Sequence, residues 1–192
     1  FIQRLLDNLA SRVHSPTTAI VVSTLVGLVG SWINWGFGLI IGAIFAKALA
    51  KKVANVDYPL LVAAAYSGFV IWHGGFSGSI PLTLSSGGDT LLTLSGNTMT
   101  EAVPLSQSVF AGYNLLIVGL LIVILPLLNR FMHPKNPTVI DPKLIKEEIY
   151  VAPQRNTPAQ KLDDSRIIAV ILLALALMYY ISEFGNNGFN LG

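Results

Sequence analysis

The chain has 192 residues, of which 53% are hydrophobic and only 11% carry a charge, and its mean hydropathy is +0.63. Because a soluble domain usually carries about 25% charged residues, this composition indicates an all-α polytopic membrane protein. A net charge of +2 gives no reason to expect a nucleic-acid partner, and the absence of cysteine excludes disulfides and thiolate metal sites.

The first predicted element is an amphipathic helix over residues 1–15. Apolar residues recur there at helical spacing, whereas Arg4 and Arg12 occupy other positions. Such a helix lies at the membrane interface, and the alternative is the tail of a preceding span. The chain begins with Phe and has no closing segment after its last apolar run, so we expect it to be an internal piece of a longer protein.

A helical hairpin is predicted over residues 16–53, with its tip near residues 31–38. All twelve Lys and Arg residues fall in three clusters, one before this segment and one near its C-terminal end, and none lies in residues 82–105. The positive-inside rule therefore places the basic clusters in the cytoplasm and residues 82–105 outside, so the segment must begin and end on one side of the membrane. Each arm has about 17 residues and is about 25 Å long, which leaves a re-entrant hairpin and two full spans as alternatives.

A broken transmembrane helix is predicted over residues 57–81. The stretch HGGFSGSIP, with three glycines and a proline, follows an apolar run of about fifteen residues and predicts a break deep in the bilayer. The hairpin tip, SWINWGFG, interrupts another apolar run. Two interruptions in neighbouring segments are the best sequence indication of a transporter's binding site.

The remainder of the chain alternates between polar and apolar segments. Residues 82–105 are predicted as an extracytoplasmic loop rich in Ser, Thr and Gly, and residues 106–132 as the clearest spanning helix, with about 20 apolar residues. A charged, Pro-rich cytoplasmic connector over residues 133–165 carries no phosphate-binding or catalytic motif. Residues 166–184 are predicted as another transmembrane helix.

The two interruptions contain no charged side chain, which limits what they bind. Helix N-termini after Asn34 and after Ser77 attract a small carboxylate, because they carry unpaired N–H groups and about half a positive charge. Backbone carbonyls, together with Asn34 Oδ1 and the hydroxyls of Ser31, Ser77 and Ser79, supply oxygen ligands that suit Na⁺. The apolar walls are provided by Trp32, Trp35, Phe37 and Phe76. The expected ligand is therefore a small carboxylate with a short hydrocarbon tail.

Other interpretations of the same residues stay open. Gly38 and Gly74 each begin a GxxxG pair, which also allows close helix packing without any ligand. Trp32 and Trp35 also fit an aromatic belt, which places the hairpin tip at the outer membrane surface. His73 is either a proton carrier or a structural residue.

Several stretches of the chain resemble the short-chain fatty acid transporter family, typified by the bacterial acetoacetate/butyrate permease. They are INWGFGLIIGAIFAKALAKKV, DYPLLVAAAYSGFVIWHGGFSGSIPL, IDPKLIKEE and SRI. The resemblance, which extends to a larger ion-transporter superfamily, implies two inverted repeats, each with a re-entrant hairpin and a broken helix. This chain matches the first repeat, so we expect a second repeat of the same polypeptide to complete the site, and no transport by this piece alone.

The resemblance implies cation-coupled uptake of short-chain fatty acids such as acetoacetate or butyrate across the bacterial inner membrane, without a cofactor. The expected partners are a small carboxylate and the lipid bilayer; Na⁺ or H⁺ coupling and homo-oligomerisation stay open. The alternatives are a non-transporting helical subunit and a related transporter for another small carboxylate, whereas no acid–base pair or metal cluster suggests an enzyme. The residues that the resemblance assigns to substrate or ion binding are Ser31, Asn34, Trp35, Gly36, Phe37, Gly38, Gly74, Gly75, Phe76, Ser77, Gly78 and Ser79.

Overall fold

The structure is a computed structural model that describes residues 2–141, 157–158, 162 and 165–187. The regular elements in these residues are all helices, and no strand occurs among them. Three helical segments are long and apolar enough to cross a membrane, namely Pro16–Ile33, Tyr58–Ser86 and Gly112–Phe131. These features confirm the prediction of a helical membrane protein.

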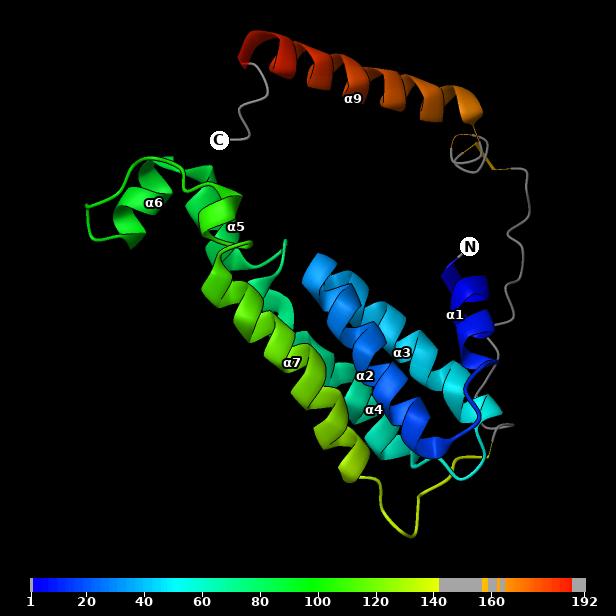
Figure 1. The fold of residues 1–192 in the computed structure, drawn as a ribbon. Helices are drawn as coiled ribbons and strands as arrows, with labels where there is room; N and C mark the ends of the chain where they lie inside the picture. The colour runs from blue at the N-terminus through cyan, green and yellow to red at the C-terminus, as the bar shows by residue number, and fades with distance from the viewer. Residues whose placement is uncertain (1, 142–156, 159–161, 163–164, 188–192) are drawn as a thin grey trace. The chain divides into compact units, whose positions relative to one another are not determined.

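Helices α2 (Pro16–Ile33) and α3 (Trp35–Lys52) form a packed pair (Figure 1). Asn34 is the single residue between them and has an extended backbone, with φ −154° and ψ 127°. Its N–H donates to Gly30 O of α2, and its Oδ1 accepts from Phe37 N of α3. One asparagine therefore caps the end of one helix and the start of the next, which explains its place in an apolar run.

The next segment is an interrupted helix. Helix α4 (Tyr58–Ser67) continues as the 3₁₀ helix η1 (Gly68–Gly74), and α5 (Ser79–Ser86) begins after residues 75–78. The carbonyl and N–H groups freed at this interruption need partners from elsewhere in the fold.

Residues 82–105, predicted as an extracytoplasmic loop, contain helical structure. Helix α5 extends into this range, and α6 (Gly88–Leu94) follows it. Gly87 and Gly88 form the turn with φ values of +63° and +73°, a conformation that glycine adopts without steric cost. The many Ser, Thr and Gly residues masked the helical spacing of apolar side chains such as Leu91, which is 3% exposed.

Helix α7 (Gly112–Phe131), preceded by η2 (Leu105–Gln107), is tied to the rest of the fold by a buried polar network. Asn129 Nδ2 donates to Thr24 Oγ1 of α2 at 3.0 Å and to Ser67 Oγ of α4 at 2.9 Å. Three helices thus share one set of hydrogen bonds inside a largely apolar bundle.

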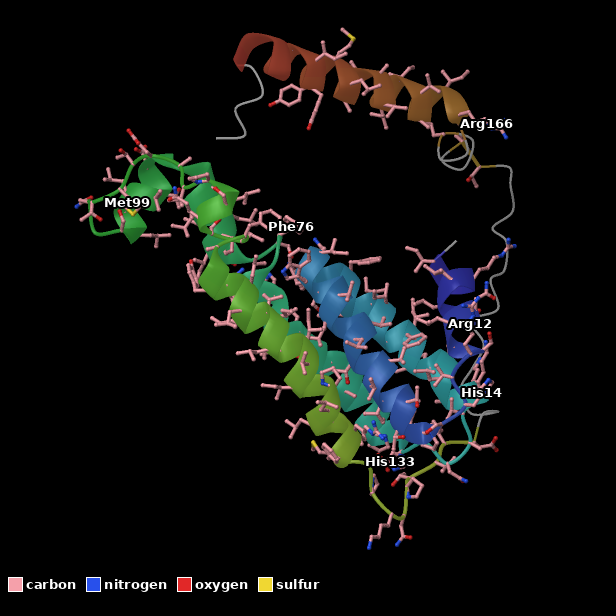
Figure 2. All side chains as sticks on the ribbon, viewed as in Figure 1. Arg12, His14, Phe76, Met99, His133 and Arg166 are labelled. Carbon is pink, nitrogen blue, oxygen red and sulfur yellow. The ribbon has the colours of Figure 1, made fainter. Side chains whose placement is uncertain are left out.

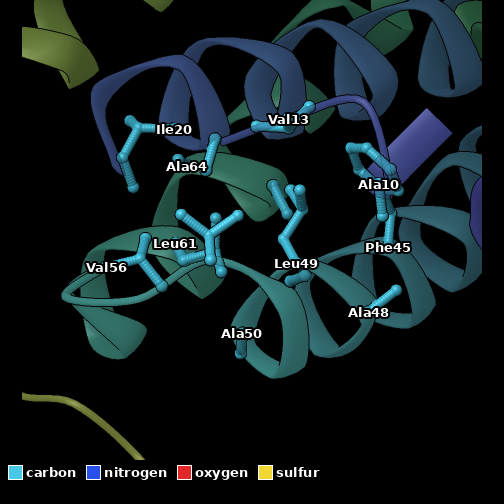
Figure 3. Packing of buried hydrophobic residues seen from close by; sticks show 14 of the residues in the cluster. Ala10, Val13, Ile20, Phe45, Ala48, Leu49, Ala50, Val56, Leu61 and Ala64 are labelled. Carbon is cyan, nitrogen blue, oxygen red and sulfur yellow. The ribbon is translucent and has the colours of Figure 1, made fainter. Parts of the chain in front are cut away.

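The main hydrophobic core lies where α1 (Ile2–Ala10), α2, α3 and α4 meet (Figure 3). Phe45 and Leu49 of α3, Ile20 of α2 and Leu61 of α4 are fully buried there. A second cluster connects α2, η1 and α7 through Leu28, Ile71 and Val118.

The turn before α4 is fastened to the segment that follows α7. Asp57 is 7% exposed; its Oδ1 accepts from Leu60 N and its Oδ2 from Thr138 N. Tyr58 N in turn donates to Thr138 O at 2.9 Å. The first residues of the connector predicted over 133–165 therefore lie against α4, and most of its later residues lie outside the described part of the chain.

The chain divides into two units, Phe1–Lys146 and Glu147–Gly192. The described part of the second unit contains α9 (Arg166–Asn187), whose apolar stretch covers Arg166–Ser182. This helix overlaps the transmembrane segment predicted over residues 166–184.

Candidate functional site

The hairpin tip and the helix break lie in direct contact. Phe76 N donates to Trp32 O at 2.9 Å, and Trp32 Nε1 donates to Gly74 O at 3.0 Å. Trp35 N donates to Ser77 Oγ at 3.0 Å across a sequence separation of 42 residues. We call this arrangement the tip–break junction. It satisfies backbone groups that the helix ends would otherwise leave unpaired.

A glycine is required where the break approaches the tip. A Cβ added to Gly75 would overlap the carbonyl of Trp32, so no larger residue fits without moving the hairpin. A hydrogen bond within the interrupted segment also holds the unwound turn, because Trp72 Nε1 donates to Ser77 O at 2.7 Å. Trp72 was not among the predicted site residues.

Helix α7 contributes a third side to the tip–break junction. Asn114 Nδ2 donates to Gly74 O at 3.0 Å and to Val109 O at 2.7 Å. Gly74 O thus accepts two hydrogen bonds, one from α7 and one from the hairpin. Asn114 lies outside the predicted set of binding residues, but the sequence marks Tyr113 and Asn114, in the first turn of an apolar span, either as residues that line the path or as an interface anchor.

Aromatic rings surround the tip–break junction. The rings of Trp32 and Phe76 meet edge to face at 4.7 Å between centroids, and those of Trp35 and Trp72 lie 5.9 Å apart. Phe110 contacts Phe76 at 5.7 Å. Figure 2 labels Phe76 close to the tip of the α2–α3 hairpin. These rings form an apolar frame around the polar backbone groups.

Four of the predicted site residues have solvent-exposed side chains at the tip–break junction. Trp35 is 46% exposed, Phe76 40% and Phe37 37%, and Asn34 is also exposed. These exposed groups comprise an amide and three rings, which suits a ligand with one polar end and a short apolar chain.

Other predicted site residues lie inside the packing or away from the junction. Ser31 is 1% exposed and packs against Gly38 within the hairpin, and its Oγ has no hydrogen-bond partner in the described structure. Gly78 is buried and Gly36 half-buried. Ser79 begins α5 and borders a separate cavity of about 390 Å³, whose other lining residues are Ile80, Thr83, Leu84, Leu91, Leu94, Ser95 and Met99.

The start of α3 is the most polar part of the tip–break junction. Trp35 N is bonded to Ser77 Oγ, Phe37 N to Asn34 Oδ1, and Gly38 N to Asn34 O. Three of the four first-turn N–H groups therefore already have acceptors in the protein. The fourth, Gly36 N, is the donor left for a carboxylate, which can bind there beside the Ser77 hydroxyl without displacing either acceptor.

The hydrogen bonds of the tip–break junction are made by backbone groups and by Trp, Asn and Ser side chains. His73 is exposed, and its ring stacks on Trp72 with centroids 4.3 Å apart. Among the described residues, no group of three or more His, Asp or Glu side chains could hold a metal ion. Asn34 and Ser77 offer side-chain oxygens, which suit a hard cation better than a transition metal.

Comparison with known proteins relates this architecture to transport. Residues 1–192 match the family described as short chain fatty acid transporter. Two curated relatives, whose names assign them provisionally to short-chain fatty acid transport, come from Escherichia coli strain K12 and Haemophilus influenzae strain Rd. They are 40% and 38% identical to the chain over 99% of its length.

The chain spans less than half of these relatives, 43% of the first and 44% of the second. No solved structure matches it. The matches point to a transporter rather than an enzyme and confirm the resemblance found in the sequence. The chain belongs to the short chain fatty acid transporter family.

Proposed function

We propose that this chain is part of a cation-coupled secondary transporter that takes up short-chain fatty acids such as acetoacetate or butyrate. The observation that carries the proposal is the tip–break junction, where two interrupted helical segments are hydrogen-bonded to each other. Paired helix interruptions are characteristic of transporter binding sites. Membership of the short chain fatty acid transporter family supports the choice of substrate.

The substrate carboxylate binds at the start of α3 in this proposal. Its oxygens accept hydrogen bonds from Gly36 N and from the hydroxyl of Ser77, whose oxygen stays bonded to Trp35 N, and gain from the partial positive charge at the helix end. The hydrocarbon tail lies against the exposed rings of Phe37 and Phe76. A Na⁺ ion held by Asn34 and Ser77 oxygens, or a proton, balances the substrate charge, because the junction bonds involve no charged side chain.

The proposed topology follows from the distribution of basic residues. Residues 82–105 face the outside and residues 133–165 the cytoplasm of a bacterial inner membrane. The α2–α3 hairpin is re-entrant, and its exposed tip faces an aqueous path rather than lipid. An inverted second repeat of the same polypeptide supplies the other half of the site, which agrees with relatives more than twice as long as this chain.

The test uses the full-length protein in proteoliposomes with radiolabelled butyrate. Removing the Ser77 or Asn34 side chain (Ser77→Ala, Asn34→Ala) should lower uptake at least tenfold and change its dependence on the Na⁺ or H⁺ gradient. Ser86→Ala is the matched control, because Ser86 Oγ donates only within α5, to Thr83 O. Unchanged uptake in both junction variants would refute the proposed site.

A non-transporting helical subunit is the second candidate, and glycine packing favours it. Gly38 lies directly against Ser31 inside the hairpin, as expected for a residue that serves only close packing. Single-cysteine labelling at Asn34 separates the two functions. A label that reacts from water and is protected by butyrate supports transport, whereas a site that stays unreactive favours the packing module.

A further inference from the structure

Helix α1 has a wider apolar face than its contacts in the protein require. Leu6 and Ala10 are 5% and 0% exposed, because they pack into the main core. Ile2, Leu5 and Leu9 are 43%, 57% and 37% exposed. The apolar face is therefore divided into a docked half and a free half.

The helical geometry places these two halves side by side. At about 100° per residue, Ile2, Leu5 and Leu9 lie within an arc of about 60°, and the docked residues occupy the adjoining arc. Arg4 and Asp7 point to the side roughly opposite the free half. Helix α1 thus has one side against protein, one free apolar side and one polar side.

The docked half fixes the helix beside α3. Figure 1 shows α1 next to the C-terminal half of α3, and the core cluster joins Leu6 and Ala10 with Phe45 and Leu49. Lys52 Nζ also donates to Asp7 O at 2.7 Å. Because the helix is held from this side, it cannot rotate to bury its free half in the same core.

The charge around α1 is strongly basic. Residues 1–56 contain five basic side chains and one acidic one, Asp7. Arg4 and Arg12 are exposed. A second copy of the chain bound through this face would bring like charges together, which opposes self-association. An anionic surface with an apolar interior fits both the charge and the free apolar half.

We infer that α1 is a lipid-docking helix that lies in the headgroup layer of an anionic leaflet. Ile2, Leu5 and Leu9 enter the upper acyl region, and Arg4 and Arg12 bind lipid phosphates. The inference goes beyond transport, because it names a membrane-surface contact that does not depend on the solute carried.

Spin labelling of the full-length protein in liposomes tests the depth of α1. The chain itself has no cysteine, so single cysteines at Leu5, Leu9, Leu6 and Asp7 report separate sides of the helix. Labels at Leu5 and Leu9 should be several-fold more accessible to oxygen than to a water-soluble nickel chelate, and the label at Asp7 should show the reverse. The label at Leu6 should be shielded from both reagents.

Two results would overturn the inference. Nickel accessibility at Leu5 and Leu9 equal to that at Asp7 would place the face in water. Shielding at Leu5 and Leu9 as complete as at Leu6 would mean that protein covers the face.

A separate measurement tests whether α1 requires anionic lipid. Vesicles containing phosphatidylglycerol should give a deeper Leu5 label than pure phosphatidylcholine vesicles, and 0.5 M salt should reduce the difference. The double substitution Arg4→Gln with Arg12→Gln should abolish the lipid dependence, whereas Lys135→Gln should preserve it. An identical depth in both lipids for the unmodified protein would contradict the assignment of lipid phosphates.

Discussion

At the scale of single residues, the orientation of Asn129 is set by its neighbours. The hydroxyls of Thr24 and Ser67 donate to Ile20 O and Ala64 O at 2.9 and 2.8 Å. Their hydrogens are used, so both present lone pairs to Asn129, and only its NH₂ group is complementary. The network therefore needs a donor at this position rather than any polar group.

Replacing the donor should reveal this requirement. Asn129→Leu removes the two hydrogen bonds and should cost about 0.6–1.7 kcal/mol, from the average to the largest value measured for such bonds between membrane helices. Asn129→Asp should cost more near neutral pH, because an ionised carboxylate faces only lone pairs. Thermal unfolding of the full-length protein at several pH values measures both. Because protonation restores an O–H donor, acidification should partly rescue the Asp variant but leave the Leu variant unchanged.

At the scale of elements, glycine determines how closely α2 and the α4–η1 segment cross. A Cβ at Gly27 would overlap the carbonyl of Ala65, and one at Gly68 would overlap the backbone of Gly27. Both obstacles are backbone, so a rotamer change in a neighbour cannot relieve them. The tip–break junction depends on this crossing, because its hydrogen bonds join the ends of the same two segments.

Gly27→Ala should therefore destabilise the protein and also lower uptake, even though Gly27 does not contact the tip–break junction. Overpacking of this kind usually costs about 1–3 kcal/mol. Gly119→Ala in α7 is the matched control, since nothing lies within 4 Å of the added Cβ, and it should be neutral or slightly stabilising. Thermal unfolding and butyrate uptake measure both variants. Equal melting temperatures for the two variants would show that the crossing tolerates an added methyl group.

Some helix ends have local signals in the sequence. Asn34 within an apolar run, and the glycines before Ser79, mark helix ends through backbone chemistry that needs no tertiary contact. Helix α6 was missed because its polar composition resembles a loop. The bonds from Trp72 and Asn114 could not be predicted, because they depend on how helices far apart in the sequence align.

At the scale of the whole molecule, the family match and the fold describe complementary parts of the proposal. The match covers the entire chain and names a substrate class. The fold brings the two interrupted segments together and so gathers helix ends from both at one place. Carboxylate binding by the full-length protein therefore depends both on the hydrogen bonds of single residues and on the helix crossing that holds them in place.

If the tip–break junction binds a short-chain carboxylate, the ligand should stabilise the full-length protein. Butyrate at 100 times its dissociation constant contributes about 2.7 kcal/mol, enough to raise the melting temperature by roughly 3 °C or more in a protein of this size class. n-Butanol, which has the same tail without the carboxylate, should give a much smaller shift. Ser77→Ala should reduce the butyrate shift and Ser86→Ala should retain it, since of these two serines only Ser77 bonds to the start of α3. Equal shifts with butyrate and butanol would mean that the helix end does not recognise the carboxylate.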